Sequence, residues 1–568
     1  MRRILPMLFI LTMLLACRAG FPLPTATPVP SPTGTATRTA LPPTPTPSAS
    51  PTPTDTPTAT PTPIPPAPVF QVEYHPDGPL YVGDVISISV LTPADAPLDG
   101  SNLSIQVPQP DGTLIGPQAF SGWGIAGRSQ ATFVWAWDTL GLEPGDATLT
   151  FTIQPQGYTF TDTVTLLPES ALPPLQQDAH WVLTTNQCCN IYTISGTAAE
   201  RDLTALTAMM DAQAEHAMQA MGASFSEPLT ITLMPRLLGH GGFASSEIYV
   251  SYLDRNYAAN SWEMVVHHEM IHVLDLRLGG DLRPSILAEG LAVYMSGGHY
   301  RPELLLPRAA ALLPETLDWY IPLRELANDF YSFQHEIGYL QAGALVQYMV
   351  ETYGWEAYSS FYRDIHPSTD GSHASALDTA LYAHFGLSLE ALEQAFITAL
   401  QQQTGVETWR EDVRLTVVYF DTLRRYQQLW DPSAYFRTAW LMDGPSMRER
   451  GIVADLLRHP SEPANLALEA LLITASDHLV SGDFAQAEDI LTVVNQVLEA
   501  AEDGEVSPFD VHPLAADYLE ITAVLAQSGY EAQSIEISGN TASVLVTAQE
   551  VDLIELQLTV VQSAWQIH

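Results

Sequence analysis

Proline dominates the chain between Arg18 and Pro68, where it supplies 17 of the 51 residues and threonine, alanine and serine supply most of the rest. A segment of this composition has too few large apolar side chains to bury a core, and its prolines favour an extended conformation. We therefore predict that residues 18–68 form a disordered stalk and that folding begins at about residue 69. The part that remains, residues 69–568, is too long for one ordinary domain and predicts a multidomain protein.

The residues before the stalk have the features of an export signal. Arg2 and Arg3 precede an apolar run, residues 4–16, that is too short to span a bilayer as a helix. The run ends in Leu-Leu-Ala before Cys17, which resembles the lipobox of bacterial lipoproteins. This resemblance implies that residues 1–17 are a lipoprotein signal, that Cys17 is acylated, and that the protein is exported and anchored to the membrane at the bacterial cell surface. The alternative is an ordinary signal peptide with a chance cysteine.

The charge balance narrows the possible partners. The chain carries 64 Asp and Glu against 22 Lys and Arg, for a net charge of −42, and it contains no lysine. Nucleic acids and anionic lipid headgroups need a basic surface that replaces their counterions, so we expect no nucleic-acid partner. Reactions that depend on a lysine amine, such as Schiff-base formation, are excluded as well.

Short alternating segments fill residues 69–168. Residues 85–90 and 148–153 alternate apolar with polar side chains, and Pro-Asp-Gly and Pro-Gly-Asp turns separate segments of this kind. Short strands at this spacing predict an N-terminal all-β, immunoglobulin-like sandwich with a structural or binding role.

Helical patterns enter after that region. In residues 175–403, strand-like segments mix with long helices at 198–221 and 261–278, which predicts a central α+β domain. Residues 406–568 begin with helices and end with strands, the last of them at 560–567. We expect a C-terminal α+β domain whose role the sequence does not indicate.

Cysteine is too rare for a disulfide scaffold, because the chain has only three. Cys188 and Cys189 are adjacent and can either form a vicinal disulfide or stay buried as thiols. A metal site at this pair is disfavoured, since zinc ligands normally have at least two residues between them.

Histidines one helical turn apart lie in the helix predicted at 261–278. His268, Glu269 and His272 form an H-E-x-x-H motif, in which both histidines lie on one face of the helix and can reach one zinc ion. Glu269 is close enough to a zinc-bound water to act as general base without being a ligand. His267 points off that face, so we assign it no ligand role. The motif alone is also compatible with a histidine pair buried in a core.

A third ligand is needed, because zinc in hydrolases usually has three protein ligands and a water. Glu289 is the one carboxylate of an apolar helix predicted at 284–296. A buried carboxylate requires a partner, and zinc would supply one. Residues 273–283 contain no histidine, which excludes the metzincin class. We therefore predict a Zn²⁺ site formed by His268, His272 and Glu289.

These motifs resemble those of the gluzincin metallopeptidases. The H-E-x-x-H pair followed by Ala-Glu-Gly-Leu-Ala at 288–292 is similar to the bacterial peptidase MA-like families, and the similarity extends over residues 180–400. It implies a gluzincin-type central domain, the three zinc ligands above, and Glu269 as general base. It also implies that Tyr339, which opens a Y-x-x-A helix segment, stabilises the oxyanion beside the zinc. A core aromatic is the other interpretation of Tyr339, and His335 is the rival donor.

Two departures from related enzymes affect the prediction. Thermolysin-like enzymes carry an aspartate four residues after the third ligand, where this chain has Val293, so another group must orient His272, and Asp275 is one candidate. Aminopeptidases bind the substrate amine with a G-x-M-E-N stretch on an edge strand. The comparable stretch here is 241–246, with Glu247 only nearby, and so we do not predict an aminopeptidase. The edge strand can still bind a substrate backbone by strand addition.

The sequence thus predicts a lipid-anchored zinc endopeptidase of the cell surface that acts on peptide or protein substrates. The alternative is a non-catalytic binding or structural protein on a metallopeptidase scaffold, although such a protein would have no need of Glu269. Hydrolysis of another amide, such as one in cell-wall material, ranks last, because no segment resembles a wall-binding repeat.

Overall fold

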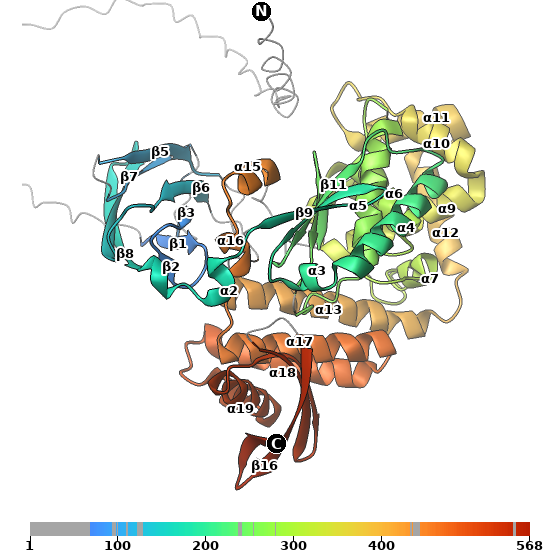
Figure 1. The fold of residues 1–568 in the computed structure, drawn as a ribbon. Helices are drawn as coiled ribbons and strands as arrows, with labels where there is room; N and C mark the ends of the chain where they lie inside the picture. The colour runs from blue at the N-terminus through green and yellow to red at the C-terminus, as the bar shows by residue number, and fades with distance from the viewer. Residues whose placement is uncertain are drawn as a thin grey trace, which may run out of the picture. The chain divides into compact units, whose positions relative to one another are not determined.

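The computed structural model describes residues 69–568, except for 94–97, 99, 109–111, 122–128, 237–240, 254, 279, 432–433, 435–442 and 549–552. The predicted signal (1–17), the lipidated Cys17 and the stalk (18–68) lie outside the described residues. None of the helices that the structure describes is long and apolar enough to cross a membrane. The architecture is multidomain, with a β-rich N-terminal region followed by mixed helices and strands (Figure 1).

Two sheets form the N-terminal region. The first has the order β1 (Gln71–His75), β3 (Val85–Leu91), β6 (Gln130–Asp138); the second has the order β2 (Leu80–Tyr81), β8 (Tyr158–Leu167), β7 (Gly145–Gln154), β4 (Asn102–Gln106), β5 (Leu114–Ala119). Alternate side chains of the strands, among them Ile88, Leu103 and Phe151, are fully buried in one core. The period-two pattern therefore predicted the strands correctly, and the immunoglobulin-like topology stays a prediction.

A five-stranded sheet forms the centre of the next region. Its order is β12 (Gly242–Ala244), β13 (Ile248–Ser251), β11 (Leu229–Met234), β10 (Cys189–Ile194), β9 (Trp181–Thr185), with the two outer strands antiparallel to their neighbours. The helix expected at 198–221 is divided at Asp202 into α3 (Ala198–Arg201) and α4 (Leu203–Met221). Cys188 and Cys189, left open by the sequence, are joined in a vicinal disulfide at the start of β10.

Three helices of this region carry the predicted site: α5 (Trp262–Leu278), α6 (Ser285–Ser296) and α9 (His335–Tyr353). Glycines let α6 and α9 approach closely, because a Cβ on Gly290 would lie 2.5 Å from the Ala342 carbonyl oxygen and one on Gly343 would lie 2.5 Å from Val293 Cγ1. The remaining elements here are α2 (Pro174–Gln177), α7 (Leu305–Ala310), α8 (Leu323–Asn328), η3 (Phe330–Ser332), α10 (Trp355–Arg363), α11 (His373–Phe385) and α12 (Leu389–Gln401).

The C-terminal region starts with the long helix α13 (Val406–Trp430), which runs beside α17 (Pro463–Ser481) and α18 (Phe484–Glu502) (Figure 1). One face of α13 joins the central core through Val413 and Val417, and another face joins the C-terminal core through Leu415 and Tyr419. The other described elements are α15 (Gly444–Glu449), α16 (Ala454–Leu457), η4 (Pro508–Val511), α19 (Pro513–Gln527) and the antiparallel strands β14 (Glu531–Ser538), β15 (Thr541–Thr547), β16 (Leu553–Val561) and β17 (Ala564–Ile567).

The prediction of one final strand at 560–567 is wrong. β16 ends at Val561, and β17 returns antiparallel to it from Ala564. Gln562 and Ser563 form the connection and have φ values of 52° and 66°. A tight hairpin of this type requires two residues at positive φ, and glutamine and serine are not residue types that predict such a turn.

Candidate metal centre

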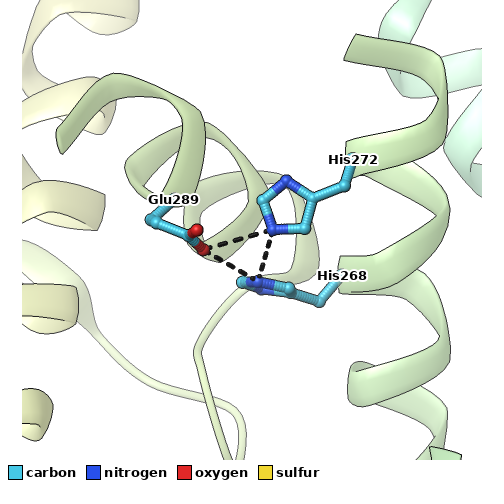
Figure 2. Close-up of side chains that lie close together, drawn as sticks. All are labelled: His268, His272 and Glu289. Carbon is cyan, nitrogen blue, oxygen red and sulfur yellow. Dashed lines mark hydrogen bonds and ion pairs between the residues drawn. The ribbon is translucent and has the colours of Figure 1, made fainter. Parts of the chain in front are cut away.

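The helix α5 lies inside the central region rather than on its surface. It packs against α4, α6 and the strands β12 and β13, and its residues from Val265 to Ile271 are all buried. A helix covered on several sides carries apolar side chains almost all around, so polar residues on it need partners. His268 and His272 direct their imidazoles toward α6, where Glu289 faces them (Figure 2).

The three predicted ligand side chains converge to a small triangle. His272 Nε2 lies 3.0 Å from His268 Nε2 and 3.2 Å from Glu289 Oε2, and His268 Nε2 lies 3.5 Å from the same oxygen. Zinc bonds of about 2.0 to 2.2 Å at tetrahedral angles would put neighbouring ligand atoms about 3.3 to 3.6 Å apart. The triangle therefore has the size of one face of a zinc coordination tetrahedron. Within the described part of the chain, no other group of three His, Cys, Asp or Glu side chains converges in this way.

Solvent reaches one side of this triangle. The His268 side chain is 7% exposed, whereas those of His272 and Glu289 retain 17% and 13% exposure. A cation held by the three atoms would thus lie beside two side chains that solvent partly reaches. Catalytic zinc sites need an open position, and structural zinc sites do not have one.

The charges of the site are strongly coupled. Burial alone would lower the pKa of His272, but the charge of Glu289 and the hydrogen bond to it outweigh burial and raise that pKa to about 9. The imidazoles in turn hold the pKa of Glu289 well below its usual range, although burial opposes this. Burial lowers the pKa of His268. Glu289 is therefore ionised beside the two imidazole nitrogens, and a divalent cation would replace the proton that this carboxylate holds on His272.

Glu269 lies on the adjoining face of α5, toward the edge strand β12. The side chain is buried, and burial raises its pKa to about 8; the charge of His272 opposes this rise and the charge of Glu289 adds to it. Gly241 accepts a backbone hydrogen bond from Ser251 of β13, and Ser245 donates one to Glu247 in the turn, so that the backbone groups of Gly242 and Ala244 face the open edge of the sheet. The Ala244 N–H donates a hydrogen bond to the Glu269 carboxylate. This arrangement suits a group that takes up a proton and is oriented by the edge strand.

Tyr339 lies close to the ligands but is not bonded to them. Its ring centroid is 6.5 Å from that of His268, and the residue is only 8% exposed. The ring stacks on His299 with a centroid separation of 4.0 Å, and His335 lies 4.1 Å away on the same helix. Burial raises the pKa of the Tyr339 hydroxyl well above its usual value. Tyr339 thus belongs to an aromatic cluster beside the site.

The sequence analysis missed a second tyrosine, Tyr331. Its hydroxyl donates a hydrogen bond of 2.7 Å to Oε1 of Glu289, the oxygen that does not take part in the triangle. The side chain is 66% exposed and lies in the short 3₁₀ turn η3, between α8 and α9. A three-residue turn has no periodic pattern that could have indicated this role.

Asp275, the candidate for orienting His272, and Glu247, the carboxylate nearest the edge-strand stretch, are engaged by other residues. Asp275 accepts hydrogen bonds from Arg283 Nη1 and the Tyr362 hydroxyl, both at 2.9 Å, and no hydrogen bond between described atoms joins it to His272. It acts on His272 through its charge, which helps to raise the pKa of that imidazole. Glu247 is held by both guanidinium nitrogens of Arg448, at 2.6 and 2.9 Å.

Comparison of the sequence with protein-family models gives no match, and comparison with curated proteins gives none either. The function must therefore be argued from the chemistry of the site.

Proposed function

We propose that this protein is a zinc-dependent peptidase that uses His268, His272 and Glu289 as ligands and Glu269 as general base. The observation that carries the proposal is the triangle of ligand atoms, 3.0 to 3.5 Å on a side, with two partly exposed ligands and a buried carboxylate beside it. Two imidazoles and one carboxylate with an open position are a donor set typical of hydrolytic zinc sites.

The positions of the two imidazole Nε2 atoms support a cation site. His268 and His272 turn their Nε2 atoms toward each other at 3.0 Å and toward the same Glu289 oxygen. Without a cation, the raised pKa of His272 places a proton between this imidazole and Glu289. A single divalent cation would satisfy all three atoms.

Zinc, when bound, supplies a Lewis acid for a substrate carbonyl and lowers the pKa of water. Glu269 would accept the proton of the attacking water and deliver it to the leaving amine, as a raised carboxyl pKa near neutrality allows. The Ala244 N–H would hold Glu269 in place between these transfers. A tyrosine hydroxyl, from Tyr331 or Tyr339, would stabilise negative charge that develops on the carbonyl oxygen.

The gluzincin resemblance and the arrangement of α5 and α6 support a peptidase of the MA-like type. The bidentate contact with Arg448 engages Glu247, so this carboxylate does not offer a binding group for a substrate amine. We therefore propose an endopeptidase rather than an aminopeptidase. Export and a lipid anchor at Cys17 remain part of the proposal on sequence grounds.

Zinc content and cleavage test the proposal together. The purified chain should bind one zinc by elemental mass spectrometry, and Glu289→Ala should lose it or bind it far more weakly. Glu269→Gln should keep the zinc but lose cleavage of a peptide library, because the variant lacks only the base. A chain that takes up no zinc contradicts the metal site. Zinc without cleavage by the unsubstituted chain would favour the binding-scaffold alternative.

A further inference from the structure

A short segment of the C-terminal half packs against the edge of the central sheet. We call residues 443–458, which contain α15 and α16, the strap. Arg448 of the strap makes the bidentate ion pair with Glu247, which lies in the turn between β12 and β13, and also donates to Thr232 Oγ1 at 2.9 Å. The two charged side chains are 11% and 9% exposed, so the pair is largely screened from water.

A second contact joins the strap to the same β12–β13 hairpin. The Gly444 N–H donates to the Tyr249 hydroxyl at 2.9 Å, and the Tyr249 ring stacks on Phe243 of β12 with a centroid separation of 4.6 Å. A Cβ on Gly444 would lie 2.6 Å from the Tyr249 oxygen and 2.8 Å from Glu247 Oε2. Only glycine therefore allows the strap to come this close to the hairpin.

The hairpin in turn lies directly against the helix of the site. A Cβ on Gly242 would be 2.7 Å from Val265 Cγ1 and 3.4 Å from Glu269 Oε1. Ala244, two residues further, donates its N–H to Glu269. The position of β12 thus fixes the surroundings of Glu269.

The other contacts of the strap reach the N-terminal β-rich region. Trp135 of β6 donates its indole N–H to Asp455 at 2.8 Å, and Arg450 donates to the Trp135 carbonyl oxygen at 3.0 Å. Arg458 pairs with Asp84 through two bonds of 2.6 and 2.9 Å, and both side chains are buried. One segment of 16 residues therefore holds the edge strand at one end and the N-terminal sheets at the other.

We propose that the strap is a positioning element through which the N-terminal sheets hold β12 against Glu269, with Arg448 and Glu247 as positioning residues. The N-terminal sheets and the strap would thus both contribute to the arrangement of the site. This role rests on the proposed function only where catalysis is concerned, because the position of β12 can be measured without a substrate.

Hydrogen exchange of the zinc-loaded full chain, measured by mass spectrometry, tests the proposal directly. Glu247→Gln and Arg448→Gln should each speed exchange in the peptide covering 241–251 by about tenfold, while the peptides of α5 keep their protection. Trp135→Phe should have the same effect to a smaller degree, since it removes the bond to Asp455. Arg425→Gln is the control, because it removes another bidentate arginine pair, with Glu502, that is more exposed and lies on α13 rather than at β12.

Two further readouts separate positioning from a general loss of structure. The visible spectrum of the Co²⁺-loaded variants should match that of the unsubstituted chain, because the three ligands are unchanged. With a peptide substrate, kcat/KM of Arg448→Gln should fall about tenfold or more, and Arg448→Lys should recover part of it.

Unchanged exchange at 241–251 in both Glu247→Gln and Arg448→Gln would overturn the proposal. An effect of these two variants without any effect of Trp135→Phe would overturn the part played by the N-terminal sheets. If the unsubstituted chain cleaves no peptide, the proposed function fails, and the exchange data still decide whether the strap positions β12.

Discussion

We expect substitutions of Tyr331 and Tyr339 to affect zinc binding differently, although both residues lie beside the candidate ligands. Only Tyr331 is bonded to a ligand, through the 2.7 Å contact with Glu289 Oε1. We predict that Tyr331→Phe weakens zinc binding, whereas Tyr339→Phe does not. The two substitutions remove the same atom, which makes each the control for the other.

The size of the effect follows from the exposure of the bond. A hydrogen bond to a charged group contributes about 1.5 to 3 kcal/mol when water is excluded. Tyr331 is 66% exposed, so water replaces part of the lost bond and we take a value just below that range, about 1.4 kcal/mol. That value corresponds to about a tenfold increase in the zinc dissociation constant. It also agrees with the range of about 10- to 100-fold for groups that orient metal ligands.

Competition with a chromophoric chelator at fixed pH measures this effect. We expect about a tenfold weaker dissociation constant for Tyr331→Phe and a change of less than about twofold for Tyr339→Phe. Equal affinities for the two variants, or a larger loss for Tyr339→Phe, would refute the assignment of Tyr331 as the partner of Glu289. If Tyr339→Phe keeps the zinc and lowers kcat by about 10²-fold, the resemblance has placed the oxyanion donor correctly.

Two other substitutions test the edge strand beside the site and the protonation of His459. Gly242→Ala forces β12 away from α5, because its Cβ would lie 2.7 Å from Val265 Cγ1, and a shift of about 0.7 Å should lower kcat/KM about 10- to 100-fold at unchanged zinc content. Full activity of this variant would show that β12 does not orient Glu269. His459 is half-buried near Arg255 and Arg236, and desolvation and these charges lower its pKa from 6.5 to about 3. The unfolded chain therefore binds a proton below pH 6.5 that the folded chain does not, and folding stability falls as the pH drops from 6.5 toward 3. At pH 5 the loss is about 2 kcal/mol, so the thermal midpoint should fall less between pH 7.5 and 5 in His459→Gln than in the unsubstituted chain. An equal fall in both would contradict a neutral His459 in the folded chain.

The candidate ligands could be predicted because each is encoded by a local pattern. The spacing of His268 and His272 fixes their common face once the segment is a helix. Glu289 stands out as the one carboxylate of an apolar helix, and the structure places all three side chains together. The strands of the N-terminal sheets and the helices of the central region follow from periodicity in the same way.

The features that the sequence did not reveal depend on contacts between distant residues or on turns without a typical sequence. Tyr331 belongs to a turn of three residues, and its role appears only when η3 lies against α6. The turn at Gln562 and Ser563 has neither glycine nor asparagine. Glu247 and Arg448 are 201 positions apart, and no local pattern pairs them.

Arginine is the only basic residue besides histidine in this chain, and the structure shows which contacts the arginines make. Several pair with buried or largely buried carboxylates that are far away in the chain: Arg236 with Asp431, Arg255 with Glu469, Arg308 with Asp412, Arg448 with Glu247 and Arg458 with Asp84. A guanidinium stays charged when buried and binds a carboxylate in a fixed, planar geometry, whereas a lysine amine holds neither its charge nor its direction as well. Pairs of this kind specify which segments meet more than they add net stability, because burial of both charges costs nearly as much as their attraction returns. Two of these pairs end on α13 or on Asp431 directly after it, and the pair of Arg448 and Glu247 ends in the turn after β12. Replacing these arginines with lysine should therefore disturb the arrangement of the site and its neighbours while it leaves the net charge unchanged.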